Sequence, residues 1–154
     1  MKGSVIRDLE PLAARADVGA WSEVAELIRA AGGYRWVGLY LVTDTEIRAV
    51  AWTGPTAPAF PRFAREKGLN GVVVSTKAPV ICQDVSKDSR YLTTFSSTGS
   101  EAVFPVLSDA GHVVGTIDVE SDLPNAFTSD DERLLAHCAA AARPLWKSVP
   151  CRGI

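Results

Sequence analysis

Two acidic side chains in an apolar segment are the residues of this sequence best suited to bind a cation. Asp118 and Glu120 lie two positions apart, and side chains two apart on a β-strand share one face. That face can simply be solvated, which is the commoner situation for acids on a strand, or it can line a pocket. In a pocket, carboxylates this close raise one another's pKa or require a cation. An ammonium group, a guanidinium group or a metal ion would meet that requirement.

Aromatic residues on a predicted strand could complete such a pocket. Trp36 and Tyr40 are four positions apart, so both project from the same face of the strand. Trp52, on the predicted partner strand, can complete an aromatic box or pack under a helix. Aromatic residues at such positions are often ordinary core residues. If they line a pocket, they favour an organic cation over a hard metal ion.

The thiols make a weaker case for catalysis. Cys82 lies in a short apolar segment typical of a buried, inert cysteine, so it is only a weak nucleophile candidate. Cys138 lies on the apolar face of a predicted helix, and Cys151 lies in the C-terminal tail. Three cysteines without CxxC spacing predict neither a disulfide framework nor a structural zinc site. No Ser-His-Asp set, P-loop or HExxH motif is present. We expect no metal and no cofactor.

Hydrophobic periodicity predicts the elements that would position these residues. Gly32 and Gly33 end the second helix, and Thr128 begins the last one, with Asp131 at the capping-box position. The predicted helices are 4–16, 18–31, 72–77 and the one after Thr128; the predicted strands are 34–42, 46–53, 79–83, 101–107 and 112–120; the predicted loops are 54–61 and 84–99.

This order of elements predicts an α+β domain with one antiparallel sheet of about five or six strands, flanked by the N- and C-terminal helices. We expect a single domain over 1–154, with N-terminal helices over 1–32, the sheet, pocket and closing helix over 33–148, and a tail over 149–154. The loop 84–99 is long, polar and rich in Ser and Thr. Long loops inside compact domains usually form lids or binding surfaces.

Several segments together resemble the GAF domain family. The strand 113–121 (VVGTIDVES) is followed at 125–132 by NAFTSDDE, a phenylalanine and an acidic helix start. Upstream, 67–71 (KGLNG) is similar to the family's turn into its pocket helix, and 80–85 (VICQDV) to the strand after it. Each motif alone is weak, but their order and spacing extend the resemblance over 21–145, and it implies a GAF-type fold.

Within that family, the chain is most similar to the free methionine-(R)-sulfoxide reductases, which reduce free methionine sulfoxide with cysteine thiols. In them an aromatic pair encloses the ligand and three carboxylates hold its polar groups. The resemblance implies that Trp36 and Tyr40 form the aromatic pair here. It implies that Glu101, Asp118 and Glu120 are the three carboxylates.

The reductases' thiol positions fall on other residue types in this chain. By spacing, they correspond to Phe60, Asn70 and Thr94. None of these side chains can form a sulfenate or a disulfide. Asn70 and Thr94 therefore become candidate ligand contacts, and we predict a sensor that binds an amine or amino-acid-like ligand without turning it over. A reductase that relocates its thiol to Cys82, and an interaction module with an empty pocket, are the alternatives.

Composition limits the classes of partner that the protein is expected to bind. Charged residues make up 22% of the chain and the net charge is −2, so nucleic acid and acidic membranes are not expected partners. No signal peptide or apolar stretch of about 18 residues is present, which predicts a cytoplasmic protein. Without an output domain, a sensor of this size would pass its signal to a partner through dimerisation or docking, and we expect a homodimer. Trp21 and Trp146, on the terminal helices, are the candidate dimer anchors.

Overall fold

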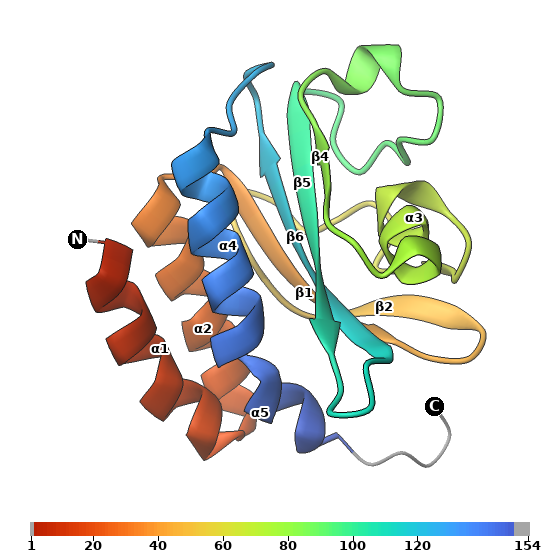
Figure 1. Cartoon of the computed structure of the whole chain (residues 1–154). Helices are drawn as coiled ribbons and strands as arrows, with labels where there is room; N and C mark the ends of the chain where they lie inside the picture. The colour runs from red at the N-terminus through yellow and green to blue at the C-terminus, as the bar shows by residue number, and fades with distance from the viewer. Residues whose placement is uncertain (1, 150–154) are drawn as a thin grey trace.

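The computed structural model describes residues 2–149, and one six-stranded antiparallel sheet forms its centre (Figure 1). The strand order is β3-β2-β1-β6-β5-β4. The strands are β1 (Trp36–Val42), β2 (Glu46–Thr53), β3 (Arg62–Ala64), β4 (Val80–Cys82), β5 (Ser100–Leu107) and β6 (Val113–Ser121). The predicted fold class and strand number are therefore confirmed.

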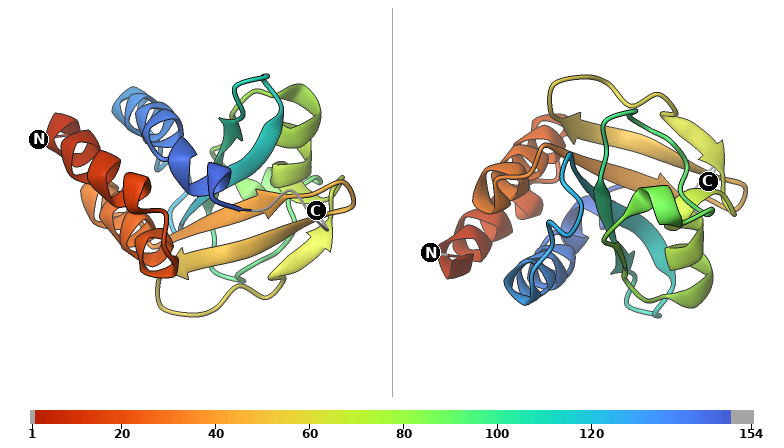
Figure 2. Two further views of the ribbon diagram at one scale, coloured as in Figure 1. Left: turned by 90° about the horizontal axis from the view of Figure 1, so that it is seen from below. Right: turned by 90° about the horizontal axis from the view of Figure 1, so that it is seen from above.

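Helices cover the two faces of the sheet unequally. Figures 1 and 2 show the N-terminal and C-terminal helices together on one face, and α3 with the loop 84–99 on the other. The helices are α1 (Lys2–Arg15), α2 (Val18–Gly32), α3 (Gly68–Thr76), α4 (Ser129–Ala141) and α5 (Arg143–Lys147), and a 3-10 turn, η1 (Val85–Lys87), interrupts the loop. The main hydrophobic core lies under the terminal helices, and smaller clusters lie under α3 and the loop.

Capping fixes the helix ends as the sequence predicts. Gly33 ends α2 in the left-handed conformation, with φ of 66°, which glycine adopts without steric cost. The Thr128 hydroxyl accepts a hydrogen bond from the Asp131 amide, and the Asp131 carboxylate accepts one from the Thr128 amide. This reciprocal capping box satisfies donors that the first helical turn would otherwise leave free.

Two local predictions need correction. The segment before α3 contains a short strand, β3, that no periodicity indicated, because three residues are too few to show alternation. The closing helix is also divided: α4 ends at Ala141, and Pro144 lies in the first turn of a separate α5. Proline lacks the amide hydrogen that a continuous helix would require there.

Trp21 and Trp146 are core residues rather than exposed dimer anchors. Their rings meet edge to face with centroids 4.8 Å apart, and both are buried. The Trp146 indole N–H donates to the Tyr40 carbonyl oxygen at 2.9 Å. These two helices therefore attach to the sheet within one chain, and the expectation that these rings anchor a dimer was wrong.

Candidate functional site

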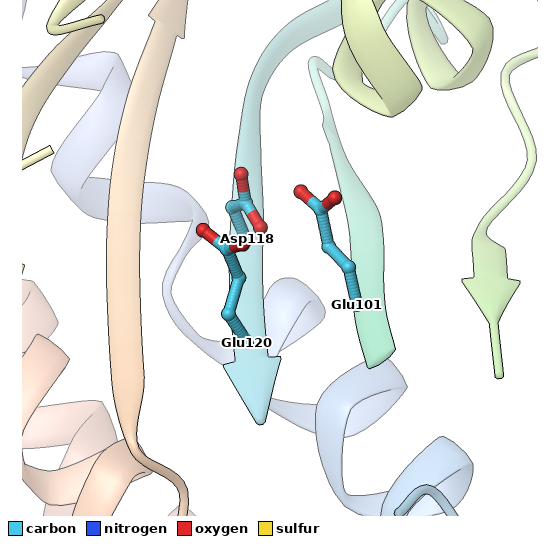
Figure 3. Close-up of side chains that lie close together, drawn as sticks. All are labelled: Glu101, Asp118 and Glu120. Atoms are coloured by element: carbon cyan, nitrogen blue, oxygen red, sulfur yellow. The ribbon is translucent and has the colours of Figure 1, made fainter. Parts of the chain in front are cut away.

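Three carboxylates converge on the sheet face that the loop covers. Glu101 on β5 pairs directly with Glu120 on β6, and Asp118 precedes Glu120 by two positions on the same face. Figure 3 shows the three side chains close together, rising from the two neighbouring strands. Their exposed fractions are 3% for Glu101, 2% for Asp118 and 0% for Glu120. This burial rules out the solvated interpretation of these acids, and the ligand-binding role of the cluster stays a prediction.

Neutral donors hold two of the three acids in place. The Asn70 side-chain amide donates to Asp118 Oδ2 at 2.9 Å, and Thr116 Oγ1 donates to Asn70 Oδ1 at 2.5 Å. On the other side, Tyr91 and Thr98 donate their hydroxyls to Glu120 Oε1 at 2.9 and 3.0 Å. The sheet, α3 and the loop are thus joined through the acid cluster. Asp118 Oδ1 and Glu120 Oε2 are buried and accept no hydrogen bond from a donor in the described part of the chain.

Burial makes the ionised forms of these acids unfavourable. Burial, followed by the charges of Asp118 and Glu120, raises the pKa of Glu101 well above its usual range. Burial also raises the pKa of Glu120 to about 8, although its hydrogen bonds from Tyr91 and Thr98 oppose the shift. The pKa of Asp118 rises for the same first reason, and hydrogen bonds from Glu101 and then Asn70 act against the rise. The cluster therefore favours a proton or a bound cation.

One arginine, Arg35, lies near this cluster but forms its salt bridge with Asp122 instead. Its Nε lies 2.8 Å from Asp122 Oδ1, and its guanidinium lies over the Phe95 ring, 5.0 Å from the centroid. This residue, Arg35, lowers the pKa of Glu120 through its charge, yet its buried Nη1 has no hydrogen-bond partner among the described residues. The described residues form no salt bridge to Glu101, Asp118 or Glu120. The cluster keeps most of its negative charge uncompensated whenever it ionises.

Aromatic rings form the wall beside the acids. Trp36 and Tyr40 are both fully buried, with ring centroids 6.4 Å apart. Phe95, from the loop, packs edge-on against Trp36 at 5.3 Å, and Phe63 packs against Tyr40 at 5.8 Å. The shared orientation predicted for Trp36 and Tyr40 is present because both lie on the pocket face of β1.

A small cavity of about 10 Å³ opens between Glu101, Asp118, α3 and the loop. Typical pockets for organic ligands occupy about 300–1,000 Å³, so this one has room for about one water molecule and admits no organic ligand until the loop moves. Nine residues line it: Tyr40, Phe63, Gly68, Leu69, Asn70, Leu92, Thr94, Glu101 and Asp118.

Not every predicted site residue reaches this cavity. Asn70 and Thr94 line it. Trp36 and Glu120 are buried but are not among the lining residues, and Trp52 on β2 is 38% exposed and also outside the lining. Cys82 pairs with Glu101 across β4 and β5, but burial raises the pKa of its thiol above the usual value. A buried thiol with a raised pKa is a poor nucleophile. The sequence predicted that the loop lies over the site but did not single out its residues Tyr91 and Thr98, because an isolated hydroxyl in a polar loop gives no signal.

Comparison with known proteins agrees with this architecture. The sequence profile described as "GAF domain" matches residues 20–143. Among curated proteins, the chain is 34% identical over 101 residues to "GAF domain-containing protein A" of Dictyostelium discoideum, covering 65% of this chain and 62% of that one. It is 29% identical over 107 residues to "Free methionine-R-sulfoxide reductase" of Saccharomyces cerevisiae, covering 68% and 58%. The aligned region thus spans about three fifths of these relatives' length.

Solved structures show the same fold. The free methionine-R-sulfoxide reductase of Neisseria meningitidis, in complex with its substrate, superposes with a TM-score of 0.85 at 26% identity, covering 96% of this chain and 89% of that one. The type II enzyme of Thermoplasma acidophilum superposes with a TM-score of 0.79 at 28% identity, covering 90% and 94%.

Proposed function

The chain belongs to the GAF domain family, and from that premise we propose that it is a non-catalytic sensor that binds a small amine or amino-acid-like ligand. The observation that carries this proposal is the cluster of three buried carboxylates, two of which have an oxygen without a hydrogen-bond donor among the described residues. Buried charges are stable only when paired, so the site is built for a cationic group. A ligand ammonium supplies both the positive charge and the missing donors.

The wall of the site favours an organic cation. Tyr40 lines the cavity together with Asp118, and Trp36 packs beside Tyr40. Aromatic faces attract organic cations, and their edges provide apolar contact for the rest of the ligand. The narrow cavity would widen by movement of the loop 84–99, since Leu92 and Thr94 of that loop line it.

The same loop provides a means to signal. Tyr91 and Thr98 both donate to Glu120 Oε1, so the loop is bonded to one of the groups that would hold the ligand. An ammonium bound at Glu120 would change these two hydrogen bonds and thereby shift the population of loop conformations.

We further propose that the protein acts in the cytoplasm as a homodimer. The described part of the chain contains no helix long and apolar enough to cross a membrane.

A sulfoxide reductase is the second candidate, because two of the similar structures are free methionine-R-sulfoxide reductases. The residues at the expected thiol positions argue against it. Asn70 and Thr94 line the cavity, and Phe60 is 42% exposed and outside the lining. Cys82 is the thiol beside Glu101, and its raised pKa leaves little thiolate at neutral pH.

A thermal-shift screen tests the sensor proposal. The protein, in buffer with EDTA, is melted against free amino acids, polyamines and other small amines, each matched with its N-acetylated counterpart. Binding to the native state raises the melting temperature. We expect at least one free amine to raise it while its acetylated form does not. No shift from any amine would contradict the proposal, and methionine sulfoxide turnover with dithiothreitol that is lost in Cys82→Ser would favour the reductase instead.

A further inference from the structure

We propose that Glu101, Asp118 and Glu120 also form a binding site for a hard divalent cation, with Ca²⁺ the best fit, and that this cation competes with the organic ligand. Figure 3 shows the three side chains that would hold the ion. The proposed Ca²⁺ site depends only on the three carboxylates, whatever the organic ligand is. Only the proposed competition between Ca²⁺ and the organic ligand rests on the proposed function.

Oxygen spacing favours Ca²⁺. One carboxylate oxygen from each residue can be chosen so that all three lie within 4.8 Å of one another. Ca²⁺ binds oxygen at about 2.3–2.6 Å, so two ligands on opposite sides of it lie up to about 4.6–5.2 Å apart. Mg²⁺ binds at about 2.0–2.1 Å and spans only about 4.2 Å. An oxygen pair near the upper end of this bound fits across Ca²⁺ and exceeds the span of Mg²⁺, which favours the larger ion.

Unused hydrogen-bonding capacity provides an independent indication of a ligand. Asp118 and Glu120 are at least 98% buried. Even so, Asp118 Oδ1 and Glu120 Oε2 accept no hydrogen bond from a donor in residues 2–149. The other oxygen of each acid is held, Asp118 Oδ2 by Asn70 and Glu120 Oε1 by Tyr91 and Thr98. Such second contacts orient metal-binding carboxylates and leave one oxygen of each available. The free oxygens are thus fixed in position before any ion arrives.

Size and charge both match an ion. The adjoining cavity of about 10 Å³ is too small for an organic ligand but has room for about one water molecule, which could serve as a further ligand of an ion held between the carboxylates. Ionised, the three acids carry three negative charges, and the nearby Arg35 is already paired with Asp122 and packed on Phe95. A divalent cation would neutralise most of the remaining charge. A proton on Glu101 is the competing occupant, and it would exclude the ion.

Calorimetric titration of EDTA-treated, dialysed protein with CaCl₂ and MgCl₂ tests the site. We expect saturable Ca²⁺ binding that is weakened at least tenfold in Asp118→Asn and in Glu101→Gln. Glu132→Gln, which removes an exposed acid on α4, is the matched control and should bind like the wild type. Mg²⁺ should bind at least tenfold more weakly than Ca²⁺. Absence of Ca²⁺ binding by the wild type, or equal binding by wild type and Asp118→Asn, would overturn the proposal.

Terbium luminescence gives a readout on the wild type alone, in case either variant fails to fold. Trp36 pairs directly with Glu120 across β1 and β6, so excitation of tryptophan should sensitise a Tb³⁺ ion bound at the cluster. Ca²⁺ should quench this emission by displacement, and Mg²⁺ should do so only at higher concentration. Emission that is absent, or that Ca²⁺ does not displace, would refute the site. Because the amine screen is run in EDTA, failure of the cation site and failure of the sensor proposal give separate results.

Discussion

Raising the pH from 5 to 8 should destabilise the ligand-free protein, and Glu120 should account for a large part of the loss. The pKa of this carboxyl rises from an ordinary 4.5 to about 8 on folding, chiefly because it is buried. The folded state therefore holds a proton that the unfolded state releases. This contribution to stability is fully present below pH 4.5 and is lost as the pH rises through about 8.

The size of the effect follows from that pKa difference. Each pH unit corresponds to about 1.4 kcal/mol, so the span from 4.5 to about 8 sets a ceiling of roughly 5 kcal/mol. Native domains have total stabilities of about 5–15 kcal/mol, so even half of this ceiling would be readily measured. Glu101 contributes in the same direction, since its pKa is also raised.

The assay is urea denaturation in EDTA at several pH values, for the wild type and for Glu120→Gln. A glutamine oxygen can still accept the hydroxyls of Tyr91 and Thr98 but cannot ionise. The variant should match the wild type near pH 5 and exceed its stability at pH 8 by about 1–3 kcal/mol. Glu132→Gln controls for the loss of an exposed charge. Parallel pH profiles for wild type and Glu120→Gln, or a variant less stable at pH 8, would refute this reasoning.

Four other outcomes are expected. Gly115→Ala should lower stability by about 1–3 kcal/mol in urea denaturation, because a Cβ there would lie 1.8 Å from the Trp146 indole nitrogen; wild-type stability would contradict the packing. Tyr91→Phe should speed amide hydrogen exchange across the loop by removing its bond to Glu120, and unchanged exchange would show that this bond does not hold the loop. No methionine sulfoxide turnover is expected with dithiothreitol, and turnover that survives Cys82→Ser would contradict the assignment of the thiol positions. Light scattering should show a homodimer, and a monomer at high protein concentration would count against it.

The fold could be predicted from the sequence wherever periodicity or end signals are strong. The two strands of each hairpin and the capping box of Thr128 and Asp131 were placed to within a residue or two. The three-residue β3 was missed because alternation needs a longer segment to be visible. The helix α3 was predicted four residues too short at its start, because Gly68 and Asn70 read as a turn while their tertiary contacts hold them in the helix.

The site was harder to predict, because it depends on contacts between distant elements. The side-chain period of two correctly placed Asp118 and Glu120 on one face, but only strand pairing places Glu101 opposite Glu120. Dependence on tertiary contacts also explains the wrong prediction for two tryptophans. Trp21 and Trp146 were expected at a surface, yet their rings pack against each other, and Trp146 also donates to the carbonyl oxygen of Tyr40, 106 residues away in the sequence. Side-chain identity alone does not distinguish an exposed aromatic anchor from a buried one.

The central claim, that the acid cluster binds the cationic group of an organic ligand, is tested most directly by one calorimetric comparison. The amine that gives the strongest thermal shift is titrated into wild type and Asp118→Asn, in EDTA, beside its N-acetylated form. A charge-assisted hydrogen bond contributes about 1.5–3 kcal/mol, so we predict that either change weakens binding at least tenfold. Equal affinity of the free and acetylated amines for the wild type, or of wild type and Asp118→Asn for the free amine, would contradict the account.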